Sequence, residues 1–333
     1  MPVTAQDVAD KAGVSRSAVS RAFTPGASVS ARMRKRVEDA AKDLGYSPNV
    51  LASSLTTRRT KLIGLVSDNF QNPLFLEVFD LFSRGLQEKG LRPLLLNLSG
   101  EHNPENSVHL LRQYSVDGVI VASSTLPPGF AKAFSDEGIP IVHSFGRHAV
   151  SPAVTIVGID NVECGRMAAQ ALLSCGYTSV GFIGGPELAS STQDRVTGFR
   201  EEIAKHPEVH VTHSYANAYS FKAGRAEMQR LLKDKPQEAY FCGDDALAVG
   251  AMSAAEDAGY NVPGDIGFIG LNDMEIASWQ NINLTTIKQP ITDIINSSLE
   301  LMFEMLEDPD HEPQAKIFPC EIIERGTLIK NKS

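Results

Sequence analysis

Residues 3–23 read VTAQDVADKAGVSRSAVSRAF, and this stretch decides the fold of the N-terminal part of the chain. Thr4 precedes Ala5–Ala12, a segment with helical spacing of its apolar residues, and Asp7 stands three positions after Thr4. A hydroxyl residue followed three positions later by an acidic one is typical of a capping box, in which each side chain bonds the other's backbone N–H. The pattern therefore predicts a helix that begins directly after Thr4.

A glycine turn separates this helix from a second one. Gly13 can adopt the left-handed conformation that ends a helix, and Ser15 is a favourable cap for a helix over Arg16–Phe23. Two short helices joined across such a turn predict a helix-turn-helix. In this motif the N-terminal residues of the second helix reach base edges in the major groove of DNA.

Arginine and serine side chains suit that role. Arginine can bond two acceptors on guanine at once, and serine can pair with several bases. We therefore expect base contacts from Arg16, Ser17 and Arg21, with Ser15 beside them at the cap.

A third helix is predicted over Ala31–Leu44, with Ser30 as its cap and Gly45 at its end. The apolar residues of this segment have helical spacing and would complete a small core. Its other face carries basic residues that could contact phosphate or simply face water: Arg32, Arg34, Lys35 and Arg36.

Charge is distributed unevenly along the chain. The net charge is −9, but residues 1–61 carry eleven Lys/Arg and five Asp/Glu, so this part has a net charge of +6 and the remainder −15. A basic head on an acidic body is the electrostatic pattern of a DNA-binding module joined to a domain that does not bind DNA. Charge alone leaves open a basic surface that merely faces water.

From residue 62 onward, short apolar runs alternate with segments of helical spacing. One series extends from Leu62–Ser67 to 140–143, and a second from 154–159 to 266–270. Strands that alternate with helices predict parallel α/β sheets. The presence of two such series predicts two similar lobes.

Polar and aromatic residues follow the predicted strands, at 67–73, 144–145, 243–245 and 271–273. Because ligands of open parallel sheets bind beyond the carboxyl ends of the strands, these residues are candidates for a binding site. Their carboxylates, amides and rings suit a polyhydroxylated ligand. The chain has no nucleophile elbow, metal-ligand spacing, phosphate loop or dinucleotide fingerprint, so we expect no enzyme, no cofactor and no metal.

Three strings of the sequence resemble the LacI/GalR family of repressors. They are VTAQDVADKAGVSRSAVSRAF at 3–23, VSARMRKRVEDAAKDLGYSPN at 29–49 and LTTIKQP at 284–290. The resemblance extends over nearly the whole chain. It implies a DNA-reading head, a hinge, and an effector domain similar to the periplasmic binding proteins.

For the hinge, the resemblance implies a helix over 49–55 that enters the minor groove. Asn49 and Ala52 would contact DNA there, and Leu55 would act as the wedge that unstacks the central base step. Many relatives have arginine where this chain has Ser53, so an arginine contact in the minor groove is in doubt.

For the effector domain, the resemblance implies a pocket between the lobes. Arg195 matches an arginine that bonds effector hydroxyls or carboxylates, Tyr219 matches an aromatic that stacks on the ligand, and Asp244 matches a pocket amide or carboxylate. Gln289 lies at a crossover beside the cleft. The other expected pocket residues are Phe70, Asn72, Phe75, Phe145 and Asn272.

Two of these residues depart from the family pattern. Phe145 and Asn272 stand where many sugar-responsive relatives have aspartate, so the pocket should be less acidic and more aromatic. A sugar is the first choice of ligand, for example a disaccharide or glycoside. Structural roles also stay open: core or dimer-interface packing for the three phenylalanines, a helix cap for Asp244, and a turn for Asn272.

We predict an all-α helix-turn-helix head joined to a two-lobed, periplasmic-binding-protein-like α/β domain with parallel sheets. The head would span 1–47 and the hinge 48–61. The effector-binding and dimerisation domain would span 62–333. Its first lobe would comprise 62–159 plus 290–318, and its second lobe 160–289 plus 319–333.

The functional expectation is a cytoplasmic, homodimeric repressor that binds double-stranded operator DNA and releases it when a sugar binds. The sequence shows no secretory signal or apolar run long enough for a membrane, and no leucine heptads near its end. A purine or protein corepressor, a sugar-binding transport protein and an enzyme remain as alternatives. The four scattered cysteines are interpreted as reduced, structural thiols: Cys164, Cys175, Cys242 and Cys320.

Overall fold

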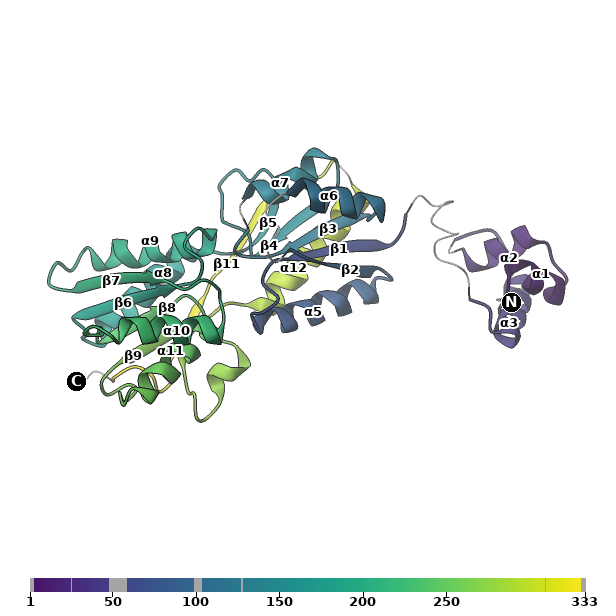
Figure 1. The fold of residues 1–333 in the computed structure, drawn as a ribbon. Helices are drawn as coiled ribbons and strands as arrows, with labels where there is room; N and C mark the ends of the chain where they lie inside the picture. The colour runs from purple at the N-terminus through teal and green to yellow at the C-terminus, as the bar shows by residue number, and fades with distance from the viewer. Residues whose placement is uncertain are drawn as a thin grey trace. The chain divides into compact units, whose positions relative to one another are not determined.

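A computed structural model of the chain describes residues 3–24, 26–47, 59–98, 104–126, 128–308 and 310–330. These residues form two compact units that are divided between Thr60 and Lys61. We call the first unit the head and the second the body (Figure 1). Within the described residues, no helix is both long and apolar enough to cross a membrane.

The described residues of the head form three helices: α1 (Ala5–Ala12), α2 (Arg16–Phe23) and α3 (Ala31–Leu44). The predicted capping box is present, because the Thr4 amide donates to Asp7 Oδ2 at 2.8 Å and the Asp7 amide donates to Thr4 Oγ1 at 3.3 Å. Gly13 has a φ of 60°, the left-handed conformation that a side chain disfavours. These bounds and caps confirm the helices predicted from the sequence.

Two arginines of α3 fasten the head together. The Arg34 guanidinium donates to the carbonyl oxygen of Ala22 in α2, and the Arg36 guanidinium donates to that of Ala12 in α1. Both carbonyls belong to the last turn of a helix, where they have no partner within the helix and the helix dipole favours a positive charge. These two contacts within the head were not predicted from the sequence; Arg34 is half-buried, and Arg36 is exposed.

The first lobe of the body contains a six-stranded sheet in the order β11-β5-β4-β3-β1-β2. Every neighbouring pair in it is parallel. Its strands are β1 (Leu62–Ser67), β2 (Arg92–Asn97), β3 (Gly118–Ala122), β4 (Ile141–Ser144), β5 (Thr155–Ile159) and β11 (Ala315–Phe318).

Helices cover both faces of this sheet: α5 (Leu74–Glu88) and α12 (Ile291–Glu307) on one, α6 (Pro104–Gln113) and α7 (Pro128–Asp136) on the other (Figure 1). The side chains of β3 alternate accordingly. Ile120 packs in the cluster that contains α5 and α12, whereas Val119 and Val121 pack with α6 and α7. A strand buried on both faces explains why its sequence is apolar throughout.

The second lobe contains another six-stranded sheet, in the order β12-β10-β9-β8-β6-β7. Only the edge strand β12 runs antiparallel to its neighbour. The strands are β6 (Ser179–Gly184), β7 (His210–Tyr215), β8 (Ala239–Cys242), β9 (Gly267–Asn272), β10 (Thr285–Lys288) and β12 (Glu321–Ile323). The helices are α8 (Asn161–Ser174), α9 (Ser190–Ile203), α10 (Phe221–Leu231), α11 (Asp245–Asp257) and the short 3₁₀ helix η1 (Glu275–Ser278).

Two glycines let α8 and α9 pack backbone against backbone. A Cβ atom on Gly165 of α8 would overlap the carbonyl oxygen of Arg195, and one on Gly198 of α9 would overlap that of Val162. Only glycine permits this approach. The contact fixes the positions of both helices next to the strand ends, and Arg195 lies within it.

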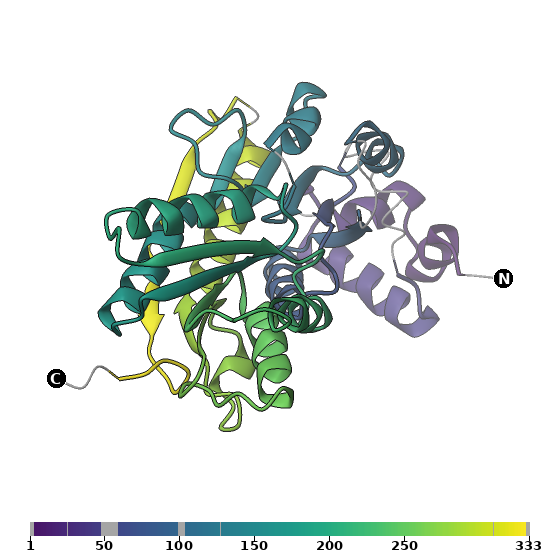
Figure 2. The same ribbon diagram turned by 60° about the vertical axis from the view of Figure 1, so that its left-hand side comes forward.

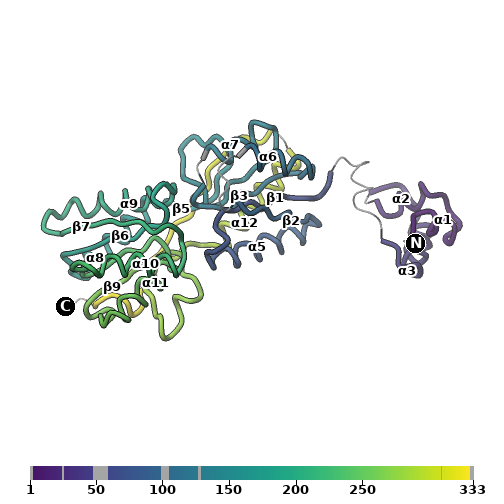
Figure 3. Tube along the Cα trace, viewed as in Figure 1, coloured from purple at the N-terminus to yellow at the C-terminus, as the bar shows by residue number. Residues whose placement is uncertain are grey.

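The chain passes between the two lobes three times: from β5 to α8, from β10 to α12, and from β11 to β12 (Figure 3). Figure 2 gives a second view of the two sheets and the yellow C-terminal strands that join them. The predicted head-plus-two-lobes architecture is confirmed. The elements after residue 270 were not predicted from the sequence: η1, α12, β10, β11 and β12.

Candidate functional site

Side chains from both lobes meet at the carboxyl ends of the parallel strands. They enclose a cavity of about 20 Å³. Eight of the nine residues predicted for the pocket line it: Asn72, Phe75, Phe145, Arg195, Tyr219, Asp244, Asn272 and Gln289. The ninth, Phe70, is not among the lining residues, and its ring packs against Phe79 with the ring centroids 4.9 Å apart.

Five further residues line the cavity: Asn69, Leu74, Ser124, Ile159 and Asn161. Asn69 belongs to the stretch 67–73 that the sequence marked as a candidate, and the other four were not predicted. Ser124 follows β3, and Asn161 follows β5. Because ligands bind beyond the ends of parallel strands, the positions after β3 and β5 are the sequence signal that could have identified both residues.

Asp244 joins the two lobes. Its Oδ2 accepts a 2.7 Å hydrogen bond from the amide of Asn72 in the first lobe, and its Oδ1 accepts a 2.8 Å bond from the backbone N–H of Leu247, which caps α11. Complete burial raises the pKa of this carboxyl to about 6, although its hydrogen bonds and the nearby Arg195 lower it. The side chain thus lines the cavity and also caps α11.

Arg195 places a positive charge inside the cavity wall. Only 4% of the residue is exposed, and its Nε donates to Asn161 Oδ1 at 2.8 Å while a terminal nitrogen donates to the Gly243 carbonyl. The guanidinium carbon lies 5.8 Å from the centroid of the Tyr219 ring, within the range of a cation–π contact. These bonds fix the guanidinium at the strand ends.

The Tyr219 ring is held in the wall by its hydroxyl. That hydroxyl lies 2.7 Å from Thr192 Oγ1 and 3.5 Å from Ser191 Oγ, both on α9. An aromatic face fixed in this way can stack on a flat or ring-shaped ligand without further loss of side-chain freedom.

Phe145 and Asn272 both have left-handed backbone conformations, with φ values of 65° and 123°. For a bulky side chain such as Phe145 this conformation is a true outlier, and outliers of this kind cluster at functional sites. Asn272 also accepts a 2.6 Å bond from the amide of Gln289. Thus the two positions that depart from the family pattern carry backbone strain beside the cavity.

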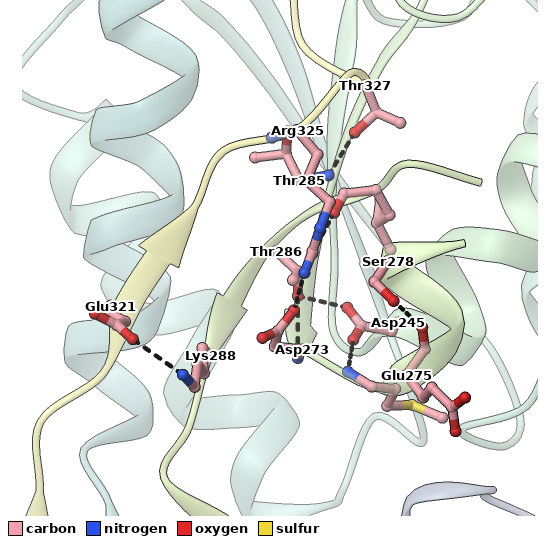
Figure 4. Close-up of polar contacts among 12 residues, drawn as sticks. Asp245, Asp273, Glu275, Ser278, Thr285, Thr286, Lys288, Glu321, Arg325 and Thr327 are labelled. Carbon is pink, nitrogen blue, oxygen red and sulfur yellow. Dashed lines mark hydrogen bonds and ion pairs between the residues drawn. The ribbon is translucent and has the colours of Figure 1, made fainter. Parts of the chain in front are cut away.

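A polar network supports the turn that holds Asn272 (Figure 4). Asp245 accepts a 2.5 Å bond from Thr286 Oγ1 and a 2.7 Å bond from the Met274 amide, and burial raises its pKa to about 7. Asp273 accepts a 2.5 Å bond from Arg325. Asp245 therefore acts as a structural support for the turn.

Contacts at the N-terminus of α9 add to the link between the lobes. Ser190 Oγ and the Ser191 amide both donate to the Ser124 carbonyl, at 3.2 and 3.3 Å. Arg147 of the first lobe forms an ion pair with Asp194. These contacts join the lobes in addition to the Asn72–Asp244 bond.

In the head, Arg16, Ser17 and Arg21 are exposed on α2. Ser15 Oγ accepts from the Ala18 amide at 3.3 Å and lies 2.9 Å from Ser17 Oγ, so Ser15 serves as the cap. The hinge residues Asn49, Ala52 and Leu55 lie outside the described residues. In the part of the chain that the structure describes, no group of three or more His, Cys, Asp or Glu side chains could hold a metal ion.

Comparisons with known proteins place this architecture among bacterial regulators. Residues 4–49 match the family described as bacterial regulatory proteins, lacI family, and residues 169–328 match the periplasmic binding protein-like domain. The transcriptional repressor PurR of Escherichia coli O139:H28 is 30% identical over 333 residues, which covers 98% of this chain and 96% of that protein.

Two solved structures extend the comparison. The Lac repressor dimer bound to operator and the anti-inducer ONPF has a TM-score of 0.87 at 23% identity, and the match covers 99% of this chain and 100% of that chain. The complex of the transcriptional regulator CelR with cellobiose has a TM-score of 0.71 at 26% identity, covering 98% and 99%. Both structures support the predicted fold class.

Proposed function

Because the chain belongs to the LacI family of bacterial regulatory proteins, we propose that it is a repressor that releases its operator when a small carbohydrate binds between the lobes of the body. Family membership makes it a DNA-binding regulator of transcription and not an enzyme. The observation that carries the proposal is the cavity, to which both lobes contribute polar and aromatic side chains.

The cavity wall offers the groups that a sugar requires. Asn72, Asn161 and Gln289 supply amide donors and acceptors, and Asp244 supplies a carboxylate. The rings of Phe75, Phe145 and Tyr219 offer apolar faces for the C–H side of a sugar ring. The complex of CelR with cellobiose is a precedent for a disaccharide among proteins of this fold.

A purine is the second candidate ligand. It is favoured by the 30% identity to PurR and by the same three rings, which could stack on a flat base. The two candidate ligands differ in the hydrogen bonds that they could form with Asp244 and Asn72. Sugar hydroxyls can donate to the carboxylate and accept from the amide, whereas a purine offers only the few donors and acceptors in the plane of its base.

We propose that ligand binding separates the two lobes. A cavity of about 20 Å³ has room for about one water molecule, so a sugar or a purine needs a wider cavity, which opening of the Asn72–Asp244 contact would provide. An effector shifts the equilibrium between two conformations only by its differential affinity for them. We propose that the operator is bound by one arrangement of the lobes and the effector by the other.

We further propose that the protein works in the cytoplasm as a homodimer. A two-fold dimer would place two α2 helices on the half-sites of a roughly palindromic operator. Arg16, Ser17 and Arg21 would read the bases, and the hinge residues Asn49, Ala52 and Leu55 would contact the minor groove.

The proposal is tested by measuring operator affinity in the presence of a ligand panel. The operator is first selected from a random DNA library with the full chain. Fluorescence anisotropy then measures affinity with cellobiose, lactose, maltose, hypoxanthine and guanine, each in large excess. We expect a sugar to weaken operator binding by about 5- to 150-fold, the usual range of allosteric coupling.

Two variants identify the site of action. Asn161→Ala should abolish the ligand effect while operator affinity without ligand is retained, and Glu300→Gln, an exposed change on α12, should behave as the parent protein. If only a purine weakens or strengthens binding, the carbohydrate assignment is wrong. If no ligand changes operator affinity, the small-molecule switch itself is wrong.

A further inference from the structure

Two cysteines meet where the chain passes between the lobes. Cys164 lies in the first turn of α8, directly after the passage from β5, and Cys320 lies between β11 and β12, in the third passage. Their Sγ atoms are 3.6 Å apart although 156 residues separate them in sequence. A disulfide bond needs about 2.05 Å between the sulfurs, so a shift of about 1.5 Å would join them.

The two thiols differ in exposure. Cys164 is 1% exposed within the core. Cys320 is partly exposed and lines a second cavity, of about 500 Å³, together with Lys288 and Glu321, whose ion pair is visible in Figure 4. A small oxidant can therefore reach Cys320 first.

The two thiols also differ in acidity. The Cys164 thiol donates a hydrogen bond to Cys320 Sγ, and this bond together with the charge of Arg195 lowers the pKa of Cys320, against the effects of burial and Asp160. The same hydrogen bond and burial raise the pKa of Cys164. The reactive form of cysteine is the thiolate, so Cys320 is the nucleophile of the pair and Cys164 the resolving thiol.

We propose that Cys164 and Cys320 form a reversible disulfide when the protein reacts with a peroxide, and that this bond cross-links the first and third passages of the chain between the lobes. The Cys320 thiolate attacks one peroxide oxygen, the O–O bond breaks, and hydroxide leaves, giving a sulfenic acid. Cys164 then loses its proton and attacks the Cys320 sulfur, and the displaced hydroxyl leaves as water. Two thiols are oxidised by two electrons and one peroxide is reduced; a dithiol reductant restores them.

The disulfide would connect two of the three passages between the lobes. The first passage carries Asn161, whose Oδ1 accepts from Arg195, so the bond would form beside the wall of the main cavity. With the two passages joined, the lobes could no longer separate freely. The consequence for the operator rests on the function proposed above, since it assumes that lobe separation accompanies ligand binding.

The chemical step is tested on the full chain with hydrogen peroxide and no other ligand. Intact-mass spectrometry should show the loss of two hydrogen atoms, and a digest without reductant should contain a peptide pair joined through Cys164 and Cys320. Cys164→Ser removes the resolving thiol, so dimedone should then label Cys320. The matched controls are Cys175→Ser and Cys242→Ser, which should still form the bond; burial raises the pKa of both thiols.

The mechanical step is tested by hydrogen–deuterium exchange of the reduced and oxidised protein. Amides of the segments around Asn161 and Cys320 should exchange about tenfold more slowly after oxidation, while α1–α3 exchange at the same rate in both states. The Cys164→Ser Cys320→Ser double variant should show no response to peroxide.

Three results would overturn the proposal: no Cys164–Cys320 bond under peroxide, oxidation of Cys320 only to sulfinic acid, or a bond that leaves hydrogen exchange around Asn161 and Cys320 unchanged. None of these readouts uses a sugar or an operator, so they are independent of the proposed effector. A sugar that fails to change operator affinity would contradict the proposed function and leave the disulfide result intact.

Discussion

The amide of Asn72 donates a 2.7 Å hydrogen bond to the carboxylate of Asp244, which lies 172 residues further along the chain and in the other lobe. Both residues are almost fully buried. A charged hydrogen bond in such surroundings is stronger than one in water, and its loss leaves a carboxylate oxygen without a donor. The bond is therefore a latch between the lobes, in the wall of the cavity.

Removing the latch should loosen the body. We expect Asn72→Ala to lower the free energy of unfolding by about 1–3 kcal/mol, because Asp244 Oδ2 loses its donor while it stays buried. Urea unfolding followed by circular dichroism measures the loss. Hydrogen exchange should become faster at the α11 N-terminus. The exposed change Gln229→Ala on α10 serves as control, and equal stability of the two variants would contradict a latch.

The pKa of Asp244 predicts a pH dependence of stability. Burial raises this pKa from 3.8 to about 6, so the folded protein holds the proton more tightly than the unfolded chain does. The resulting stabilisation is complete below about pH 4 and is lost as the pH rises through about 6. Relative to Asp244→Asn, whose amide can still cap α11, the parent protein should lose about 3 kcal/mol between pH 4 and 7.

A second aspartate provides the control for this experiment. Asp265 is exposed, and hydrogen bonds from Asn261 lower its pKa. The stabilisation from this group is therefore lost as the pH falls, the opposite direction. Urea unfolding at several pH values should show curves of opposite trend for Asp244→Asn and Asp265→Asn, each relative to the parent. Parallel curves for Asp244→Asn and the parent would refute the raised pKa.

The contact between α8 and α9 leaves no room for a methyl group. Gly198→Ala would place its Cβ on the Val162 carbonyl oxygen, and we expect a loss of about 1–3 kcal/mol from overpacking. Gly129→Ala is the matched control: this glycine lies exposed in α7 with no atom within 4 Å of the added Cβ. Since alanine favours helices, the control should be neutral or slightly stabilising in thermal denaturation.

Variants of Arg21 and Arg34 distinguish an effect on DNA recognition from an effect on the stability of the head. Arg21→Ala should weaken binding to the selected operator by about 1–3 kcal/mol and change binding to random DNA little, without lowering the melting temperature of the head. Arg34→Ala should lower that melting temperature, because the Ala22 carbonyl at the end of α2 loses its donor. Unchanged operator selectivity in Arg21→Ala would show that α2 does not read the bases.

The helices of the head could be predicted almost completely from the sequence, because residues at each helix end determine where that helix begins or stops. Thr4 with Asp7, Ser15, and the glycines after α1 and α3 each decide one helix end through their own side chain or backbone freedom. The contacts of Arg34 and Arg36 within the head were not predicted. Their partners are carbonyls of other helices, and no spacing in the sequence reveals such a contact.

The C-terminal part of the body was harder to predict. β10, β11 and β12 are three or four residues long and contain polar side chains, so their patterns do not differ from those of a loop. They are strands because a neighbouring strand from a distant part of the chain pairs with them. The latch and the cysteine pair have the same origin: Asn72 with Asp244, and Cys164 with Cys320, are contacts that only the assembled lobes create.

The threefold passage of the chain between the lobes also has a consequence for biosynthesis. Each sheet receives an edge strand from the last part of the chain, β11 for the first lobe and β12 for the second. A ribosome that has translated residues 61–290 has therefore made neither lobe in full, and until the remainder emerges the edges of β5 and β10 are open to pairing with other chains. Translation that stops shortly before β11 should yield an aggregation-prone chain in place of a repressor with one weakened lobe.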